Sequence, residues 1–382
     1  MRCKKILYWF TIFYFFNSNS LVAQINSIKS NTALSAEAAS LLKNLLGISE
    51  KGFLFGHQDD LAYGVNWRYE KGRSDVKEVT GSFPALYGWD IGGIENENST
   101  TNLDGIPFKK MKQFIQEGYQ RGGVITISWH ANSPLQNGKN AWDTTKGTVT
   151  SILPGGSNHE LYKSWLNRVA LFLVGLKGEH GELIPILFRP FHEHTGSWFW
   201  WGKSACSNFE YITLWRFTHY YLQNEKKLNN LLWVYNTSGD VKSKEEYLER
   251  YPGDDMADVL SFDAYQYDDP LKNDWFVQSS QKMLRFLEEL SEEKHKPFAL
   301  AETGYEAIPY DKWWTETLLK TVADFKISFL LIWRNHGLAS WNNKMHFYAP
   351  YKGHASSANF VDFYNHKKTI FESEAATEGM YK

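Results

Sequence analysis

Short apolar runs recur along the chain, and each run ends in polar residues before a longer segment of helical periodicity. Eight such runs are present, at residues 52–60, 83–90, 122–130, 183–193, 230–238, 258–266, 297–306 and 328–335. Near-continuous apolar runs of this length are typical of parallel strands buried on both faces. Apolar residues at three- and four-residue spacing predict helices between them, at 107–122, 158–178, 208–225, 274–296 and 310–325.

Strand followed by helix, repeated eight times, predicts an α/β protein with one (β/α)8 TIM barrel. In this fold the long βα loops form an active-site cleft. The alternative is a doubly wound open sheet, which usually has a glycine-rich phosphate-binding turn after its first strand. The first strand here ends in "GHQDD", which has no such turn. No repeat or linker divides residues 24–382, so we expect them to form one domain.

The amino-terminal segment has the order of a secretory signal. Arg2, Lys4 and Lys5 precede an apolar stretch at 6–16, and Ala23 precedes a plausible cleavage point. We therefore predict a signal peptide at 1–23 and an exported protein, either periplasmic or extracellular. An uncleaved anchor is the alternative. After cleavage Cys206 is the only cysteine, so no internal disulfide is expected.

The composition points to a neutral, flat ligand. Aromatic residues make up 16% of the chain, with 16 tryptophans, while 41 basic residues are balanced by 43 acidic ones. That balance provides no cationic surface for phosphates, which argues against nucleic acid. We expect the mature chain to be a monomer with no membrane span and no cofactor.

Catalytic groups of a TIM barrel lie at the carboxyl ends of its strands. The polar residues at these ends are His57, Gln58, Asp59, Asp60, Trp89, Asp90, Trp129, His130, Arg189, His192, Glu193, Asn236, Tyr265, Gln266, Glu302, Trp333, Arg334 and Asn335. Hydrolysis of a glycosidic bond needs two carboxyl groups. Glu193 and Glu302 end the fourth and seventh strands, which face each other across the barrel mouth. A structural pair bonded to barrel arginines is the alternative.

The stretch "RPFHEHTGSWFWWG" (189–202) resembles the acid/base segment of glycoside hydrolase family 26, the β-mannanase family of the barrel glycosidases. "ALAETGYE" (299–306) resembles its nucleophile segment, and "FGHQDD" and "SWH" resemble its first and third strand ends. His192 stands where the wider clan has asparagine, as in this family. The resemblance implies a secreted, retaining β-1,4-mannan hydrolase, with Glu193 as general acid/base and Glu302 as nucleophile.

Other residues are expected to support the two glutamates or bind sugar. His192 and Tyr265 are the predicted supporting residues, with Tyr265 donating a hydrogen bond to Glu302. The predicted substrate-binding residues are His57, Asp60, Asp90, His130, Arg189, Trp198, Trp333 and Arg334. Trp198 is expected to form a wall beside the scissile bond and Trp333 a platform under the sugar, because indole faces stack on sugar rings. Of Phe199, Trp200 and Trp201, we expect one or two to contact sugar.

A zinc site is the alternative for the histidine-rich segments. His192 and His194, or His57 with neighbouring aspartates, have ligand chemistry. However, we expect His192 and His194 to face opposite sides, and no HExxH motif is present. We therefore predict no metal.

Two further points stay open at this stage. The long segment 131–160 after the third strand either closes the cleft beyond the second glycone sugar, favouring mannobiose release, or forms an open rim. The substrate is β-mannan or manno-oligosaccharide, with β-1,3-xylan, mixed-linkage β-glucan or a non-catalytic carbohydrate-binding barrel as alternatives.

Overall fold

The structure, a computed structural model, describes residues 33–136, 138–339 and 342–382. Eight parallel strands form a closed ring, since β10 pairs with β1. They are β1 (Phe53–Gln58), β4 (Leu86–Asp90), β5 (Val124–Trp129), β6 (Ile186–Pro190), β7 (Leu231–Ser238), β8 (Val259–Gln266), β9 (Phe298–Tyr305) and β10 (Phe329–Ile332). Each lies within one of the eight predicted runs, so the predicted (β/α)8 TIM barrel is confirmed.

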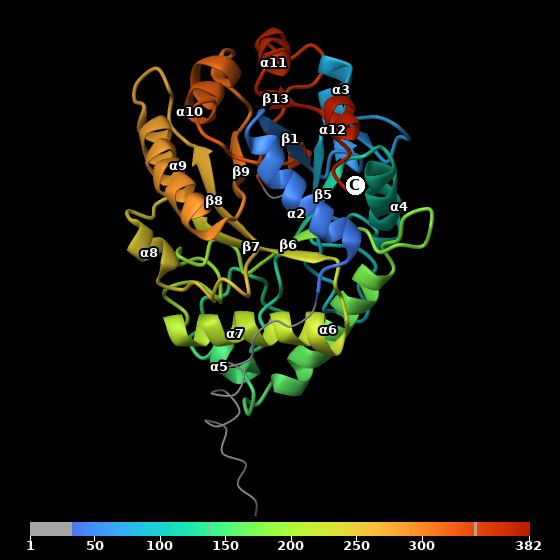
Figure 1. The fold of residues 1–382 in the computed structure, drawn as a ribbon, viewed down its shortest axis with the longest axis vertical. Helices are drawn as coiled ribbons and strands as arrows, with labels where there is room; N and C mark the ends of the chain where they lie inside the picture. The colour runs from blue at the N-terminus through green and yellow to red at the C-terminus, as the bar shows by residue number, and fades with distance from the viewer. Residues whose placement is uncertain (1–32, 137, 340–341) are drawn as a thin grey trace, which may run out of the picture.

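The inward-facing side chains of the strands pack together inside the ring, and a helix closes the amino-terminal end of the barrel. Interior side chains from all eight strands form one buried cluster: Leu54, Leu86, Val124, Leu187, Leu232, Val259, Ala299 and Phe329. Helix α2 (Ala36–Ser49) adds Leu41, Leu45 and Ile48 to it. Figure 1 shows α2 in front of the strands, and the Ser35 hydroxyl caps its first turn. The barrel is therefore a filled core whose open end is the carboxyl end.

The outer helices cover the other face of the strands, as Figure 1 shows, and enclose a second buried cluster. They are α4 (Phe108–Gln120), α6 (His159–Val174), α7 (Asn208–Tyr220) and α9 (Trp275–Lys294). All four lie within predicted helices, and Pro107 stands at the N-cap of α4 as its fixed φ favours.

The predicted helix at 310–325 differs from an ordinary α-helix. It consists of the π-helix η2 (Trp314–Leu319) and a short α10 (Lys320–Val322). A π-helix, η1 (Tyr221–Glu225), also extends α7. At η2 the adjacent Trp313 and Trp314 are both buried, one against Phe276 and the other against Phe360. The wider turn of a π-helix lets these two adjacent tryptophans pack in different directions. The spacing of apolar residues along the sequence does not predict such a turn.

The remaining elements are short. They are β2 (Tyr63–Gly64), β3 (Trp67–Arg68), α3 (Asp75–Thr80), α5 (Thr148–Ile152), α8 (Lys244–Leu248), β11 (Gly337–Ala339), β12 (Lys344–His346), α11 (Ser357–Tyr364), β13 (Thr369–Ile370) and α12 (Glu372–Glu378). No helix in the described ranges is long and apolar enough to span a bilayer. The predicted signal peptide at 1–23 lies outside the described residues.

Candidate active site

Glu193 and Glu302 converge at the carboxyl end of the barrel. One carboxylate oxygen from each, and one from Asp263, all lie within 4.8 Å of one another. Glu302 belongs to β9, whereas Glu193 follows β6 in a turn where both Phe191 and Glu193 have φ of +51°. Left-handed backbone at such residues costs on the order of 1 kcal/mol or more each, and strain of this kind clusters at functional sites.

Glu302 is held by donors on both oxygens. The Arg189 guanidinium bonds Oε1, and the Tyr265 hydroxyl donates to Oε2 at 2.7 Å. The predicted hydrogen bond from Tyr265 is therefore present. Donors on both oxygens fix the Glu302 carboxylate in one orientation.

Arg189 lies beneath the carboxylates rather than at the cleft surface. Its Nη1 bonds Asp263 at 2.9 Å and Asn236 at 3.2 Å, and the side chain is almost completely buried. Asn236 also accepts from the backbone N–H of Glu193 at 3.2 Å and donates to Asp263 at 2.8 Å. One buried network thus fixes both glutamates. The prediction that Arg189 binds substrate finds no support in this position, which makes it a positioning residue.

Glu193 has the opposite environment. Burial, followed by the negative charge of Glu302, raises the pKa of Glu193 to about 7. The indole Nε1 of Trp198 donates to its Oε2 at 2.8 Å and acts against that rise. Two neighbouring carboxyl groups whose environments separate their protonation states are suited to acid and nucleophile roles.

Beside the glutamates, Asp90, His130 and His192 form a hydrogen-bonded chain. His130 Nδ1 lies 2.7 Å from Asp90 Oδ2, and its Nε2 lies 3.1 Å from Nε2 of His192. Burial opposes the charge of Asp90, but His130 and the Ser128 hydroxyl outweigh it and lower the pKa of Asp90 to about 2. Burial and then the charge of His130 lower the pKa of His192, whereas for His130 burial is outweighed by Asp90, which raises the pKa of His130.

The profile of glycosyl hydrolase family 26 matches residues 29–296, which include the β6 end and its turn. This chain belongs to glycosyl hydrolase family 26. A mannan endo-1,4-beta-mannosidase from Bifidobacterium adolescentis is 30% identical over 370 residues, covering 91% of this chain and 36% of that protein. The chain thus spans about a third of the length of that relative.

Solved structures give the same family. A GH26 beta-mannanase from Bacteroides ovatus is 45% identical with a TM-score of 0.86, over 91% of this chain and 98% of that one. A modular endo-beta-1,4-mannanase from Cellulomonas fimi is 32% identical with a TM-score of 0.81, over 92% of this chain and 79% of that one. The predicted family is confirmed.

The remaining predicted binding residues of this family-26 barrel line the arc formed by β10, β1 and β4. His57 Nδ1 lies 2.7 Å from Asp60 Oδ1, and both side chains are buried. Arg334 pairs with Asp104 and lies 5.4 Å from the ring centroid of the half-buried Trp333. Sugar binding by these residues stays a prediction. Asp104 was not predicted, because it lies in the loop after β4 and has no strand-end position.

The aromatic run after Glu193 divides into one exposed ring and three buried ones. Trp198 is 38% exposed, whereas Phe199, Trp200 and Trp201 are buried. Trp200 Nε1 donates to the carbonyl of Ala131 at 2.9 Å, and Trp201 Nε1 to that of His192 at 2.8 Å. The expectation that one or two of the three contact sugar is therefore corrected: they hold the loop that presents Glu193 and Trp198.

The two histidines of the zinc hypothesis diverge. His192 contacts His130, whereas His194 lies between the rings of Tyr211 and Tyr235. They do not face a common ligand position, so the geometry gives no support to a site formed by this pair.

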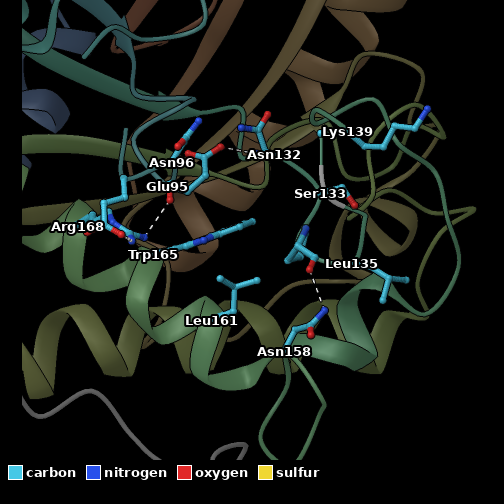
Figure 2. A pocket seen from close by; sticks show the side chains of 13 residues that line it. Glu95, Asn96, Asn132, Ser133, Leu135, Lys139, Asn158, Leu161, Trp165 and Arg168 are labelled. Atoms are coloured by element: carbon cyan, nitrogen blue, oxygen red, sulfur yellow. Dashed lines mark hydrogen bonds and ion pairs between the residues drawn. The ribbon is translucent and has the colours of Figure 1, made fainter. Parts of the chain in front are cut away.

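The long loop 131–160 lies on the barrel rim and is anchored to the aromatic loop. The backbone N–H of Trp200 donates to the carbonyl of Ala141 at 3.1 Å, and the half-exposed Trp142 stacks on His130 with ring centroids 5.2 Å apart. Behind the loop, a hollow of about 560 Å³ separates it from α6 (Figure 2). Leu135 and Trp165 line opposite parts of that hollow, and neither Glu193 nor Glu302 is among its lining residues. Whether this loop blocks the cleft stays a prediction.

Proposed function

We propose that the protein is a retaining β-1,4-mannan hydrolase acting by double displacement. The observation that supports this most directly is the close approach of Glu193 and Glu302, with oxygens within 4.8 Å, in opposite environments. Retaining glycosidases hold their carboxyl groups about 5–5.5 Å apart, whereas inverting enzymes leave about 6.5–9.5 Å for a water molecule.

Each glutamate has one role in each step. Glu302 attacks the anomeric carbon while protonated Glu193 donates its proton to the departing oxygen, which gives a covalent glycosyl-enzyme. Glu193, now ionised, takes a proton from water, which attacks the same carbon and releases Glu302. Arg189 and Tyr265 keep the nucleophile ionised and oriented, and His192 supports the acid/base loop through the carbonyl that receives Trp201 Nε1.

Mannan is the proposed substrate because the relatives named above are mannanases. The exposed Trp198 and half-buried Trp333 provide flat faces for sugar rings. The paired Asp90 and His130, together with Arg334, His57 and Asp60, provide polar groups for hydroxyls. We further propose export by a signal peptide at 1–23, a monomeric mature protein, and short products, chiefly mannobiose.

The first test is a reducing-sugar assay on mannan, β-1,3-xylan and lichenan. Release from mannan alone is expected. Release from xylan or lichenan instead would assign another β-glycan, and no release from any of them would favour the non-catalytic binding barrel.

The second test separates the two glutamates. Glu193→Ala and Glu302→Ala should each nearly abolish mannan hydrolysis while the fold, followed by circular dichroism, is retained. Only Glu193→Ala should recover much of its activity on aryl β-mannobiosides with a good leaving group, because these need no proton. Equal responses of both variants to leaving-group activation would refute the assigned roles.

A further inference from the structure

Tyr267 is a surface ring beside the catalytic pair that sequence reasoning did not single out. It lies just beyond the end of β8, and its side chain is 81% exposed. Its ring centroid lies 6.3 Å from that of Tyr265, which bonds the nucleophile Glu302. Burial, followed by the negative charges of Glu193 and Glu302, raises the pKa of Tyr267, so the hydroxyl lies close enough to both carboxylates to be affected by them. Single exposed rings are common, so the weight of the observation lies in the position of this one beside Tyr265.

The chemistry of a retaining hydrolase defines which side of the cleft this ring occupies. The general acid donates its proton to the leaving oxygen, so the departing sugar lies on the side of Glu193. Trp198, which bonds Glu193, comes from the loop after β6, and Tyr267 comes from the loop after β8. Strand β7 lies between these two strands in the ring. The two exposed rings therefore flank a single strand end.

The polar groups lie on the opposite arc of the mouth. The Arg334–Asp104 and His57–Asp60 pairs follow β10, β4 and β1, which are neighbours on the far side of the ring. The arc of β10, β1 and β4 thus carries the charged pairs together with Trp333, and the arc of β6 to β8 carries the exposed rings of Trp198 and Tyr267. Polar groups that form several bonds suit a sugar held in one orientation, whereas exposed rings suit a sugar that must arrive and leave.

We propose that Tyr267 binds the leaving sugar of a β-1,4-mannan chain and, after its departure, binds an acceptor sugar in the same place. This inference rests on the proposed function. In the transfer step the bond between the anomeric carbon and Glu302 breaks, and a bond from that carbon to the acceptor hydroxyl oxygen forms. Glu193 takes the hydroxyl proton. Tyr267 thereby sets the partition of the glycosyl-enzyme between sugar acceptors and water.

The test compares Tyr267→Ala and Tyr267→Trp with Phe209→Ala, a matched exposed ring (59%) at the start of the outer helix α7. The substrates are mannotetraose, with mannotriose added as acceptor, and an aryl β-mannobioside with a good leaving group. For Tyr267→Ala, kcat/KM on mannotetraose should fall about twofold to twelvefold, the effect of one lost ring contact. Transfer products should fall by a similar factor.

For Tyr267→Ala, the turnover number on the aryl mannobioside should stay within about twofold of wild type. With this good leaving group the slow step is hydrolysis of the glycosyl-enzyme, and its acceptor is water rather than a sugar. Tyr267→Trp should retain the wild-type values and Phe209→Ala should match wild type. If wild type is active and Tyr267→Ala equals Phe209→Ala in both assays, the inference is wrong. If Tyr267→Ala loses as much activity on the aryl mannobioside as on mannotetraose, the inference is also wrong, because Tyr267 would then affect the reaction of the glycosyl-enzyme with water rather than the binding of a leaving or acceptor sugar. A wild-type protein inactive on all these substrates refutes the proposed function itself.

Discussion

Replacing Trp198 by phenylalanine removes one hydrogen bond from Glu193 and keeps an aromatic ring in the loop. The indole Nε1 donates to Glu193 Oε2 at 2.8 Å. That bond stabilises the ionised carboxylate, so it lowers a pKa that burial and the charge of Glu302 together raise to about 7. Trp198→Phe should therefore raise the pKa of Glu193 further.

The size of the shift follows from the exposure of the donor. A hydrogen bond to a charged group contributes about 1.5–3 kcal/mol when the partner is lost without replacement. Trp198 is 38% exposed, so water replaces part of the lost interaction. We expect about 1.4 kcal/mol to remain, which corresponds to about one pKa unit.

The assay is the pH dependence of kcat/KM on mannotetraose. Glu193 must be protonated in the first step, so activity falls as pH rises through its pKa, near 7 in wild type. In Trp198→Phe this basic limb should move to about pH 8, given the one-unit shift. A basic limb that stays in place or moves to lower pH would refute the reasoning, and Trp275→Phe, at an exposed ring on α9, is the control.

Three further outcomes are expected. Trp333→Ala should lower kcat/KM on mannotetraose by an amount that corresponds to about 1–3 kcal/mol of lost transition-state stabilisation, the scale of a lost buried ring contact. Unchanged kinetics would place this ring away from sugar. Arg189→Met should lower the free energy of urea unfolding by about 3–5 kcal/mol, because it leaves buried carboxylates unpaired, whereas Arg73→Met, at an exposed pair, should cost less than about 1 kcal/mol. Equal losses for the two arginines would refute this account. Trimming the loop between residues 135 and 154 should make galactomannan viscosity fall earlier relative to reducing ends. An early fall in the intact enzyme, unchanged by trimming, would mean that the loop does not restrict the cleft.

The barrel was predictable because strands that are buried on both faces consist mainly of apolar residues. In the strand at 124–129 four of the six residues are apolar, Thr126 and Ser128 are buried with them, and the polar successor His130 lies at the open end. The convergence of Glu193 and Glu302 followed from the same rule, since strand number alone places their ends across the mouth. The predicted bond from Tyr265 to Glu302 rested mainly on the family resemblance, and the pairing of β8 with β9 brings the two residues together.

Other features depend on side-chain directions that no pattern along the chain encodes. Trp198 and Trp201 are the same residue type three positions apart, yet Trp198 is exposed and bonds the Glu193 carboxylate, whereas Trp201 is buried and bonds the His192 carbonyl. Asp104 reaches Arg334 from a loop whose path is set by tertiary contacts. The buried position of Arg189 was not predicted for a related reason. A position on a strand indicates which face a side chain lies on, but it does not indicate which buried groups that side chain contacts.

The helix that closes the barrel floor also joins distant parts of the chain. Asn44 in α2 donates through Nδ2 to the carbonyls of Gly379, Met380 and Lys382, at 3.3, 3.1 and 3.2 Å. Ring closure itself requires β1 to pair with β10, more than half the chain later in sequence. Contacts of such separation form late, because the entropy of closing a long loop opposes them until most of the sheet exists. A chain emerging amino end first therefore exposes the apolar interior of the barrel until β10 has been synthesised and can pair with β1.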